Sequence, residues 1–450
     1  MPRNPTKKLA LLPLVATTYF MVSGGAYGLE ELVACGYTTA VVALLVTPVV
    51  WSLPAALMVG ELASAIPEEG GYYAWVRRAM GPFWGFQAAW LSLVASIFDM
   101  AVYPTIFMLY LGRLLPGLGP RGSLAAGALL VLGCAVWNLR GASGVGRGST
   151  LLAVALLGPF AVFSALAFLH AGPPLSTPPP PGPHALFAGI MVAMWNYMGW
   201  DNASTIAGEV QRPERTYPRA MMLTVALVAL TYLVPVAAAA AAGIDPAGWS
   251  TGSWVEAGGV VGGRALEVAI IAGGIVCGVG MYSALLLSYS RVPLALAEDG
   301  FLPAWLNKVD PKSGAPTAAI AVCSVAYAAC LGIGFARLVE LDVLLYGASL
   351  LLEFVALVVL RIREPELARP FRVPGGILGA AALGVGPLVL LLVALWEGKD
   401  ETLGPVPTVG FGVLLALLGP VVYAWRRKKS SDRPPGPPPS PRGAVAADRD

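Results

Sequence analysis

Long apolar stretches, separated by short polar segments, run through nearly the whole of this 450-residue chain. Most stretches are about twenty residues or longer, enough for an α-helix to cross the roughly 30 Å of hydrocarbon in a bilayer. Proline and glycine inside some of them do not alter the count, because membrane helices tolerate both. The pattern predicts an all-α polytopic membrane protein with twelve spans, at residues 9–35, 38–66, 81–112, 122–138, 148–170, 184–208, 217–243, 264–296, 316–335, 338–360, 376–397 and 403–425.

Two of these spans, the first and the sixth, are interrupted in the middle by short glycine-containing breaks, at residues 23–28 and 197–202. Unwound backbone at membrane depth is tolerated only where it is buried in protein or lines a cavity. A matching pair of interrupted spans in the two halves of a chain indicates the substrate site of an inverted-repeat transporter. The break residues that we expect to contribute to such a site are Ser23, Gly24, Gly25, Tyr27, Trp200 and Asp201.

Composition supports the membrane assignment and excludes several classes of function. Hydrophobic residues make up 57% of the chain and charged residues 12%, about half the charged fraction of a typical soluble protein. The chain has only two histidines, and its five cysteines form no CxxC pair, so we interpret the cysteines as small buried apolar residues. No nucleophile–base pair or phosphate loop is visible. We therefore expect no enzymatic activity, no cofactor or metal, and no nucleic-acid partner.

The basic residues predict the orientation of the chain in the membrane. With both termini placed in the cytoplasm, 24 of the 29 Lys and Arg residues fall in inner segments and 5 in outer ones, as the positive-inside rule requires. The basic N-terminal residues Arg3, Lys7 and Lys8 precede an apolar run with no cleavage pattern, which indicates a retained first span. We expect a multi-pass protein of the plasma (inner) membrane with both termini cytoplasmic.

Three further segments have a recognisable composition. Residues 172–183 are Pro-rich and predicted to form an extended outer spacer. Residues 430–450 are polar and Pro-rich and predicted to be disordered. The outer segment 244–263 carries Trp249 and Trp254, which we expect to lie at the membrane interface as part of an aromatic belt.

Acidic residues inside the predicted spans are the main functional candidates, because charges at membrane depth are costly. They outnumber the embedded bases, which favours a cationic cargo, a coupling cation, or both. Asp99 lies four residues before Tyr103, so the two share a helix face. Glu30 follows the first break. We interpret Asp99 as the first and Glu30 as the second candidate for coupling to protons, and both as candidates for binding cargo.

Asp201 stands where the second half of the sixth span should begin. It could cap that half-helix or face the cargo. A half-helix N-terminus normally attracts an anionic group such as a substrate carboxylate. A carboxylate side chain there cancels that attraction, so the site suits an amine better than the carboxylate of an amino acid.

Two other acids, Glu61 and Glu209, occupy similar places in the two halves of the chain, each before a Pro-containing inner loop. We expect them to hold an inner gate through nearby arginines, namely Arg77, Arg78, Arg212 or Arg215, although a structural ion pair would fit equally well. Glu353 lies near the inner end of the tenth span and is expected to snorkel or to pair, with Arg361 or Arg363 as partner.

Aromatic residues near the breaks could stabilise a desolvated ammonium group by about 2 kcal/mol. Trp200 and Tyr103 are the two that we expect in the cavity wall, and ordinary helix packing is the expectation for the others. The aromatic residues in question are Tyr19, Tyr27, Tyr103, Trp195, Tyr197 and Trp200.

With these residues in view, the chain resembles the amino acid–polyamine–organocation superfamily of secondary transporters. Residues 61–86 are similar to its signature between the second and third spans, and residues 208–219 to the motif after the sixth. More narrowly, the chain resembles the polyamine uptake transporters of plants and protozoa. This second resemblance is carried by residues 22–25, by Asp99 with residues 103–104, by residues 200–205 and by the stretch 352–371.

The resemblance implies a leucine-transporter-type fold, with a 5+5 inverted repeat and discontinuous first and sixth helices. In some proton-linked relatives a lysine in the fifth span occupies the sodium position. No lysine occurs at 148–170 here, so the chain departs from that pattern. Heteromeric exchangers use an outer cysteine after the third span to join a heavy subunit, and residues 112–123 contain none, so we expect no such subunit. The expected parts are a cytoplasmic N-terminus (1–8), the first repeat (9–170), the second repeat (184–360), the last two spans (376–425) and a disordered cytoplasmic tail (426–450).

The leading hypothesis is a proton-coupled importer of polyamines or other small organic cations that works by alternating access. Its closest rival is an amino acid permease for cationic or neutral amino acids, coupled to protons or sodium or working as an exchanger. A membrane sensor that binds such compounds without transporting them belongs to a different class. Whether uptake needs a carboxylate on the cargo separates the first two, and reconstituted flux separates both from the sensor.

Overall fold

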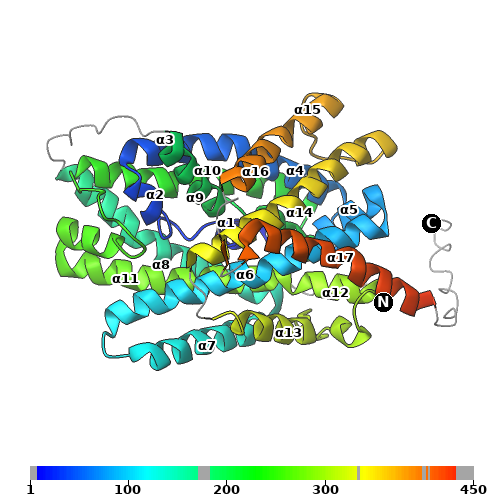
Figure 1. The fold of residues 1–450 in the computed structure, drawn as a ribbon, viewed down its shortest axis with the longest axis horizontal. Helices are drawn as coiled ribbons and strands as arrows, with labels where there is room; N and C mark the ends of the chain where they lie inside the picture. The colour runs from blue at the N-terminus through cyan, green and yellow to red at the C-terminus, as the bar shows by residue number, and fades with distance from the viewer. Residues whose placement is uncertain (1–7, 171–182, 332–334, 398–401, 404–405, 432–450) are drawn as a thin grey trace, which may run out of the picture.

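The structure is a computed structural model of the chain, and it describes residues 8–170, 183–331, 335–397, 402–403 and 406–431. The segment 172–182 and the tail beyond Ser431, for which extended and disordered structure is predicted, lie outside the described residues. Figure 1 shows long helices running roughly side by side across the view, with α2 at the left-hand end and α5 and α12 at the right-hand end.

The elements and their bounds, in chain order, are α1 (Leu11–Val22), α2 (Glu30–Ala34), α3 (Tyr37–Thr47), the π-helical turn η1 (Pro48–Ser52), α4 (Leu53–Ala65), α5 (Tyr72–Met80), α6 (Pro82–Leu114), α7 (Gly119–Asn138), α8 (Gly141–Leu169), α9 (Pro183–Asn196), the 3-10 helix η2 (Asp201–Glu209), α10 (Pro213–Ala241), α11 (Trp254–Tyr289), α12 (Arg291–Glu298), the 3-10 turn η3 (Ala304–Asn307), α13 (Thr317–Ala328), α14 (Phe335–Arg363), α15 (Gly376–Leu383), α16 (Val385–Glu397), the strands β1 (Thr402–Leu403) and β2 (Val406–Pro407), and α17 (Thr408–Ser431).

Nine helical segments in the described part of the chain are long and apolar enough to cross a membrane. The apolar helices α1 and α13 are shorter. Between α16 and α17, β1 and β2 form a two-residue antiparallel ladder in which Leu403 faces Val406. These observations confirm an all-helical polytopic membrane protein, while the count of twelve spans stays a prediction.

The first predicted break is a real interruption of helical structure. Helix α1 ends at Val22, the chain turns through Gly25 and Gly28 at φ values of +70° and +90°, and α2 begins at Glu30. These left-handed conformations favour glycine because a Cβ atom would strain the backbone. Inside the turn the Gly25 amide donates a hydrogen bond to Ser23 Oγ, at 3.1 Å.

The second predicted break has the same character. Helix α9 ends at Asn196, Gly199 takes a φ of +95°, and the chain continues as the 3-10 helix η2 from Asp201. A Cβ atom on Gly199 would collide with the carbonyl group of Met21 at the end of α1. The two breaks therefore lie directly against each other, and glycine permits their close approach.

The outer segment before α11 folds inward instead of lying at the interface. Trp254 is fully buried and Trp249 is 8% exposed, and their rings meet edge to face with centroids 4.8 Å apart. The Trp254 indole donates a hydrogen bond to the carbonyl oxygen of Ala26, at 2.7 Å. The expectation of an interfacial aromatic belt at this segment is wrong, because Trp254 covers the first break and satisfies part of its backbone.

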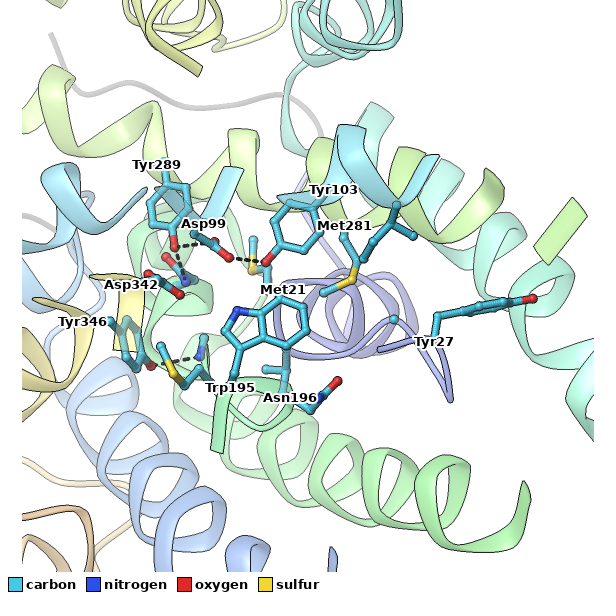
Figure 2. A pocket seen from close by; sticks show the side chains of 16 residues that line it. Met21, Tyr27, Asp99, Tyr103, Trp195, Asn196, Met281, Tyr289, Asp342 and Tyr346 are labelled. Atoms are coloured by element: carbon cyan, nitrogen blue, oxygen red, sulfur yellow. Dashed lines mark hydrogen bonds between the residues drawn. The ribbon is translucent and has the colours of Figure 1, made fainter. Parts of the chain in front are cut away.

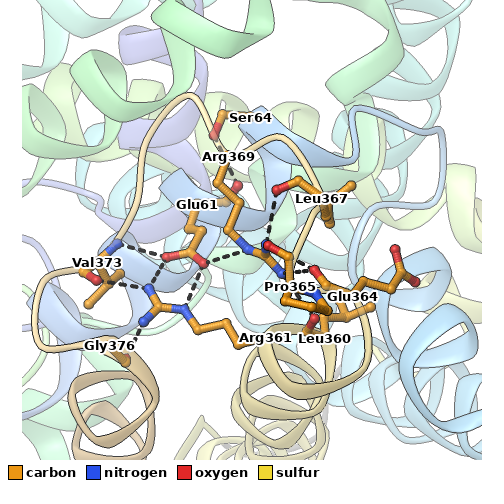
Figure 3. A network of polar contacts seen from close by, with 10 residues as sticks. All are labelled: Glu61, Ser64, Leu360, Arg361, Glu364, Pro365, Leu367, Arg369, Val373 and Gly376. Carbon is orange, nitrogen blue, oxygen red and sulfur yellow. Dashed lines mark hydrogen bonds and ion pairs between the residues drawn. The ribbon is translucent and has the colours of Figure 1, made fainter.

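The opposite end of the molecule is tied by buried ion pairs, and Figure 3 shows the one around Glu61. Glu61 and Arg361 are fully buried and hydrogen-bonded, with Arg361 Nε 2.9 Å from Glu61 Oε1. Arg369 Nε lies 3.3 Å from the same oxygen, and the Val373 amide donates to Glu61 Oε2 at 2.7 Å. These contacts join α4 to α14 and to the loop that follows it.

The partners predicted for Glu61 and Glu209 are therefore wrong. Glu209 accepts two hydrogen bonds from Arg291 at 2.8 and 3.0 Å, and both residues are buried. Of the predicted arginines, Arg77 pairs with Asp299 and Arg78 with Glu364, while Arg212 and Arg215 are exposed. Neighbouring arginines in the sequence remain near the surface, whereas arginines distant in sequence are buried beside these two acids.

Candidate functional site

A cavity lies where the two breaks meet, between α1, α6, η2, α11 and α14 (Figure 2). Both of its acidic lining residues are aspartates, and no lining residue among the described chain is basic. Aromatic and methionine side chains cover much of the remaining wall. The sixteen lining residues are Met21, Val22, Gly24, Tyr27, Asp99, Tyr103, Ile106, Trp195, Asn196, Met198, Gly199, Asn202, Met281, Tyr289, Asp342 and Tyr346.

Asp99 projects into the cavity from α6 and is held by two tyrosine hydroxyl groups. Tyr103, one turn further along α6, donates to Asp99 Oδ1, and Tyr289 of α11 donates to Asp99 Oδ2 at 3.1 Å. Figure 2 shows the carboxylate between the two rings. This arrangement fixes the orientation of Asp99 and links α6 to α11 through the cavity wall.

Asp342 is the second cavity acid, and it comes from α14. Its side chain is 2% exposed, and its Oδ1 has no hydrogen-bond partner among the described residues. Figure 2 places it beside Asp99 and Tyr289. A buried polar atom without a partner is uncommon in folded proteins, so an acceptor is left free for a ligand at this side of the cavity.

Sequence reasoning missed Asp342, although it lies inside the predicted span 338–360 and four residues before Tyr346. The criterion that selected Asp99, an acid within an apolar span and one turn from a tyrosine, applies equally to Asp342. The signal was therefore present. What the sequence could not show is that α14 brings this acid next to Asp99.

Asp201 is buried just behind the cavity wall and is not one of its lining residues. Its carboxylate accepts a hydrogen bond from the Tyr346 hydroxyl, which also accepts one from the Gly199 amide at 2.9 Å. Through Tyr346, Asp201 thus connects the second break to α14. Its neighbours Gly199 and Asn202 do line the cavity.

Glu30 lies outside the cavity lining as well, and its carboxylate is fully engaged. It accepts hydrogen bonds from the amides of Gly28 and Gly252 at 2.7 and 3.1 Å, and from the Tyr110 hydroxyl at 3.0 Å. These contacts tie the first break to the outer segment before α11 and to α6.

The other predicted site residues divide between the cavity and its surroundings. Gly24, Tyr27 and Tyr103 line the cavity, whereas Ser23, Gly25 and Trp200 do not. The Trp200 side chain is buried and its indole donates to the Tyr197 carbonyl at 2.8 Å.

Trp195 occupies the wall where Trp200 was expected. Aromatic faces stabilise organic cations, and the wall also contains the rings of Tyr103 and Tyr289. The wall therefore combines two carboxylates with several aromatic rings, surroundings that favour a cation over an anion.

Comparison with known proteins decides the family. The family model described as amino acid permease matches residues 15–423. The chain belongs to the amino acid permease family. This family falls within the amino acid–polyamine–organocation superfamily, so the resemblance seen in the sequence is confirmed, and the permease is a membrane transporter and not an enzyme.

The relatives of the permease include proteins named as polyamine transporters and one named as an amino acid exchanger. It is 34% identical to a probable polyamine transporter of Arabidopsis thaliana over 426 residues, covering 91% of this chain and 87% of the relative. It is 35% identical to a polyamine transporter of Oryza sativa subsp. japonica, covering 88% and 75%. It is 25% identical to a serine/threonine exchanger of Bacillus subtilis, covering 84% and 87%.

Proposed function

We propose that this permease is a secondary active transporter that imports polyamines or other small organic cations. In this proposal it works by alternating access in the plasma (inner) membrane, with both termini in the cytoplasm and an inward proton gradient as the driving force. The observation that carries the proposal is the cavity with two buried aspartates and no basic lining residue among the described positions.

Electrostatics supports a cationic cargo over a zwitterionic one. Two carboxylates in one water-poor cavity repel each other, and a cation between them relieves that repulsion while making charge-assisted hydrogen bonds. A cargo carboxylate would need a compensating base, and none lines the cavity. A molecule with two amino groups can offer one to Asp99 and another to Asp342. The plant relatives named polyamine transporters support the same cargo class.

The arrangement of helices supports the fold that we propose for transport. In that fold the permease has twelve spans, with the first repeat running from α1 to α8 and the second from α9 to α14. The first helix of each repeat is interrupted, at α1–α2 and at α9–η2, and the interruptions touch. Substrate sites of inverted-repeat transporters lie at such discontinuous helices.

Contacts on both sides of the cavity fit a closed intermediate of alternating access. On one side, Trp254 and Glu30 hold the first break to the segment before α11. On the other, the Leu9 amide donates to the Glu209 carbonyl at 2.8 Å, and Glu209 pairs with Arg291. In the proposed cycle these two sets of contacts open in turn.

The decisive experiment compares cargoes that differ only by a carboxylate. Putrescine, cadaverine and agmatine are ornithine, lysine and arginine without their carboxyl groups. Purified permease should show larger thermal shifts with the three amines, and proteoliposomes should take up labelled putrescine faster than ornithine. Preference for the amino acid in every pair would overturn the cargo assignment, and binding without flux would indicate a sensor.

An amino acid permease remains the second candidate, and one observation favours it. Gly24 lines the cavity in the unwound stretch that follows α1, where successive backbone N–H groups outside a helix could meet a cargo carboxylate. The Bacillus relative is named a serine/threonine exchanger, which fits that alternative. Under it, serine or threonine would bind more tightly than any of the amines.

An inward proton gradient is the driving force in this proposal. The sequence predicts Asp99 and Glu30 as the coupling residues, and in the structure both carboxylate oxygens of each already accept hydrogen bonds. Proteoliposomes with an imposed inward proton gradient should accumulate putrescine. Accumulation that ignores this gradient but requires sodium would replace protons with sodium, at a site predicted between the first break and Ser283 or Ser288.

A further inference from the structure

One buried acid, Glu353 of α14, has no role in the cavity or in the ion pairs described above. Its side chain is fully buried, and neither carboxylate oxygen has a hydrogen-bond partner among the described residues. An ionised carboxylate without a partner is very costly to bury. Glu353 must therefore either hold a proton or acquire a partner in another conformation.

The arginines expected to pair with Glu353 are occupied elsewhere, so that expectation is wrong. Arg361 is bound to Glu61 and to the Val373 carbonyl, and Arg363 donates to the Ala79 carbonyl at 3.0 Å. Both lie two or more turns further along α14. Snorkelling does not apply either, because Glu353 is enclosed by protein.

Glu353 lies on the same face of α14 as the cavity residues. Residues 342, 346, 349 and 353 follow one another at spacings of four, three and four, which places them along one side of a helix. Glu353 is eleven residues from Asp342, or about 16 Å along the helix axis toward the Glu61 ion pair. Tyr346 stands between them and donates to Asp201.

The titratable groups around Glu353 are Asp201 of η2, whose charge acts on it, and the hydroxyl groups of Tyr72 of α5 and Tyr346 of α14, on which a Glu353 charge would act. The Tyr72 hydroxyl shares a 2.6 Å hydrogen bond with Ser92 Oγ of α6. The bases along α14 and its loop are engaged elsewhere: Arg361 and Arg369 both pair with Glu61, and Arg363 donates to the Ala79 carbonyl.

Other helices against α14 add little charge. Helix α6 contributes one acid, Asp99, which lies at the cavity, and α4 contributes one acid, Glu61. None of the described side chains of α9, α15 and α16 is charged. The bases of α17 whose side chains are described, Arg426 and Arg427, lie near its C-terminal end, with Arg426 over the ring of Trp425. On α5, Arg77 pairs with Asp299 and Arg78 with Glu364. No base of the described residues forms a hydrogen bond with the Glu353 carboxylate.

We propose that Glu353 is the proton-binding site that couples the proton gradient to cargo movement. This inference rests on the proposed function. In the closed conformation Glu353 carries the proton on its carboxyl group. When the inner side opens, the proton leaves to the cytoplasm with the cargo, and the next one arrives from the outer side by way of the cavity, past Asp342, Tyr346 and Asp201.

A proton fits this position better than a metal cation. Sodium or another metal needs several oxygen ligands around it, whereas a proton needs only one carboxylate. Among the described residues no group of three or more His, Cys, Asp or Glu side chains that could hold a metal ion surrounds Glu353 or any other position. Cargo at Asp342 and a proton at Glu353 influence each other through Tyr346 and Asp201, which is a linkage between two ligands.

The test uses Glu353→Gln, which resembles the protonated acid in size and charge. In proteoliposomes of the full-length permease, putrescine binding and putrescine–putrescine exchange should stay within about twofold of wild type. Accumulation driven by an inward proton gradient should fall by at least about tenfold, since coupling energies of this size are typical. Glu256→Gln, at an outer acid whose side chain is 58% exposed, is the matched control and should accumulate normally.

The outcomes separate this inference from the function on which it rests. If wild type fails to bind putrescine, the proposed cargo is wrong. If wild type binds putrescine but ignores the proton gradient, the coupling ion is wrong. If wild type accumulates putrescine and Glu353→Gln does so equally well, only the assignment to Glu353 is overturned.

A measurement on wild type covers the case in which the variant does not fold. Dicyclohexylcarbodiimide modifies protonated carboxyl groups in apolar surroundings. Mass spectrometry of the treated full-length permease should find Glu353 labelled at acidic pH, with the labelled fraction falling as pH rises and changing when putrescine is bound. Labelling that is absent, or indifferent to both pH and putrescine, would overturn the proposal.

Discussion

Asp99 and Asp342 differ in how much of their hydrogen-bonding capacity is already used. Each carboxylate oxygen of Asp99 accepts a tyrosine hydroxyl, whereas Asp342 Oδ1 accepts nothing in the described chain. A ligand ammonium group at Asp342 therefore gains a contact without displacing one. This makes Asp342 the position where a single substitution should weaken cargo binding most.

Asp342→Asn should weaken putrescine binding by about ten- to hundred-fold, because a charge-assisted hydrogen bond contributes roughly 1.5–3 kcal/mol. Isothermal titration calorimetry on the purified permease measures this directly. Asp201→Asn is the comparison, since it removes a charge behind the wall and keeps an acceptor for Tyr346. An equal or larger loss in Asp201→Asn would show that Asp201, as the sequence suggested, meets the cargo itself.

At the residue scale the sequence predicted some of the residues that line the cavity and missed others. Asp99, Tyr103, Gly24 and Tyr27 were all selected from motifs and all line the cavity. Trp200 was selected because it adjoins the break, but the turn at Gly199 directs its indole back to the Tyr197 carbonyl. The direction of a side chain after an irregular turn depends on backbone angles that composition does not reveal.

At the scale of elements, the contact between the two breaks depends on a glycine with no room for a side chain. Gly199 and Gly36 share a φ of +95°, but a Cβ atom on Gly199 would meet the Met21 carbonyl group, whereas one on Gly36 would have no neighbour within 4 Å. Alanine substitutions at Gly36 and Gly199 therefore distinguish the cost of backbone strain from the cost of separating the two breaks.

Gly36→Ala should cost only backbone strain, about 1–3 kcal/mol, because a φ of +95° with a ψ of +146° is a conformation that residues other than glycine rarely adopt. Gly199→Ala also places alanine at a φ of +95° and in addition forces the breaks apart, so it should lower the thermal unfolding midpoint further and abolish putrescine uptake. Differential scanning fluorimetry and proteoliposome uptake measure the two effects. Equal behaviour of both variants would mean that the breaks can separate freely.

A second prediction at the scale of elements concerns the stability that ion pairs between distant elements contribute. Glu61 and Arg361 are fully buried, so Glu61→Gln leaves a buried arginine without its countercharge and should cost about 3–5 kcal/mol. Glu364→Gln removes an exposed partner of Arg78 and should cost less than about 1 kcal/mol. Thermal unfolding midpoints in detergent should rank the variants in this order, and the reverse ranking would refute the assignment of Glu61 as a buried tie.

The exposed pair also has a defined pH dependence. Hydrogen bonds from Arg78 lower the pKa of Glu364 below its ordinary value. A group whose pKa is lowered by folding contributes stability above its unfolded pKa and loses it as pH falls through the folded value. The small difference between wild type and Glu364→Gln should therefore be present at neutral pH and vanish in acid.

The positions of elements could be predicted where they depend on a local sequence pattern. Contacts between elements could not be predicted, because they depend on how distant parts of the chain pack. Both breaks were found because glycines interrupt long apolar runs, and the structure shows them at the predicted positions. The pairing of Glu61 with Arg361 joins residues 300 positions apart, and no local pattern indicates it. The burial of Trp249, before α11, and of Trp254, its first residue, was missed for the same reason.

At the scale of the whole molecule, the described ion pairs near the Glu61 end join acids and bases from several elements. Arg77 pairs with Asp299 after α12, Glu209 with Arg291 at the start of α12, and Glu61 with Arg361 near the end of α14. Figure 1 shows α5 and α12 at this end, at the right of the view. The positive-inside rule would make it the cytoplasmic end.

The last prediction concerns the side of the membrane on which each end of the molecule lies. A reporter that is active only in the cytoplasm should be active when fused after Lys429 and silent when inserted at Pro179, because 24 of the 29 basic residues fall on the side assigned to the cytoplasm. An insertion at Gly314, in the turn before α13, is an internal control that should also be active. Activity at Pro179 with silence at Gly314 would invert the permease in the membrane. It would then place the buried ion pairs on the outer side and reverse the direction in which Glu353 releases its proton.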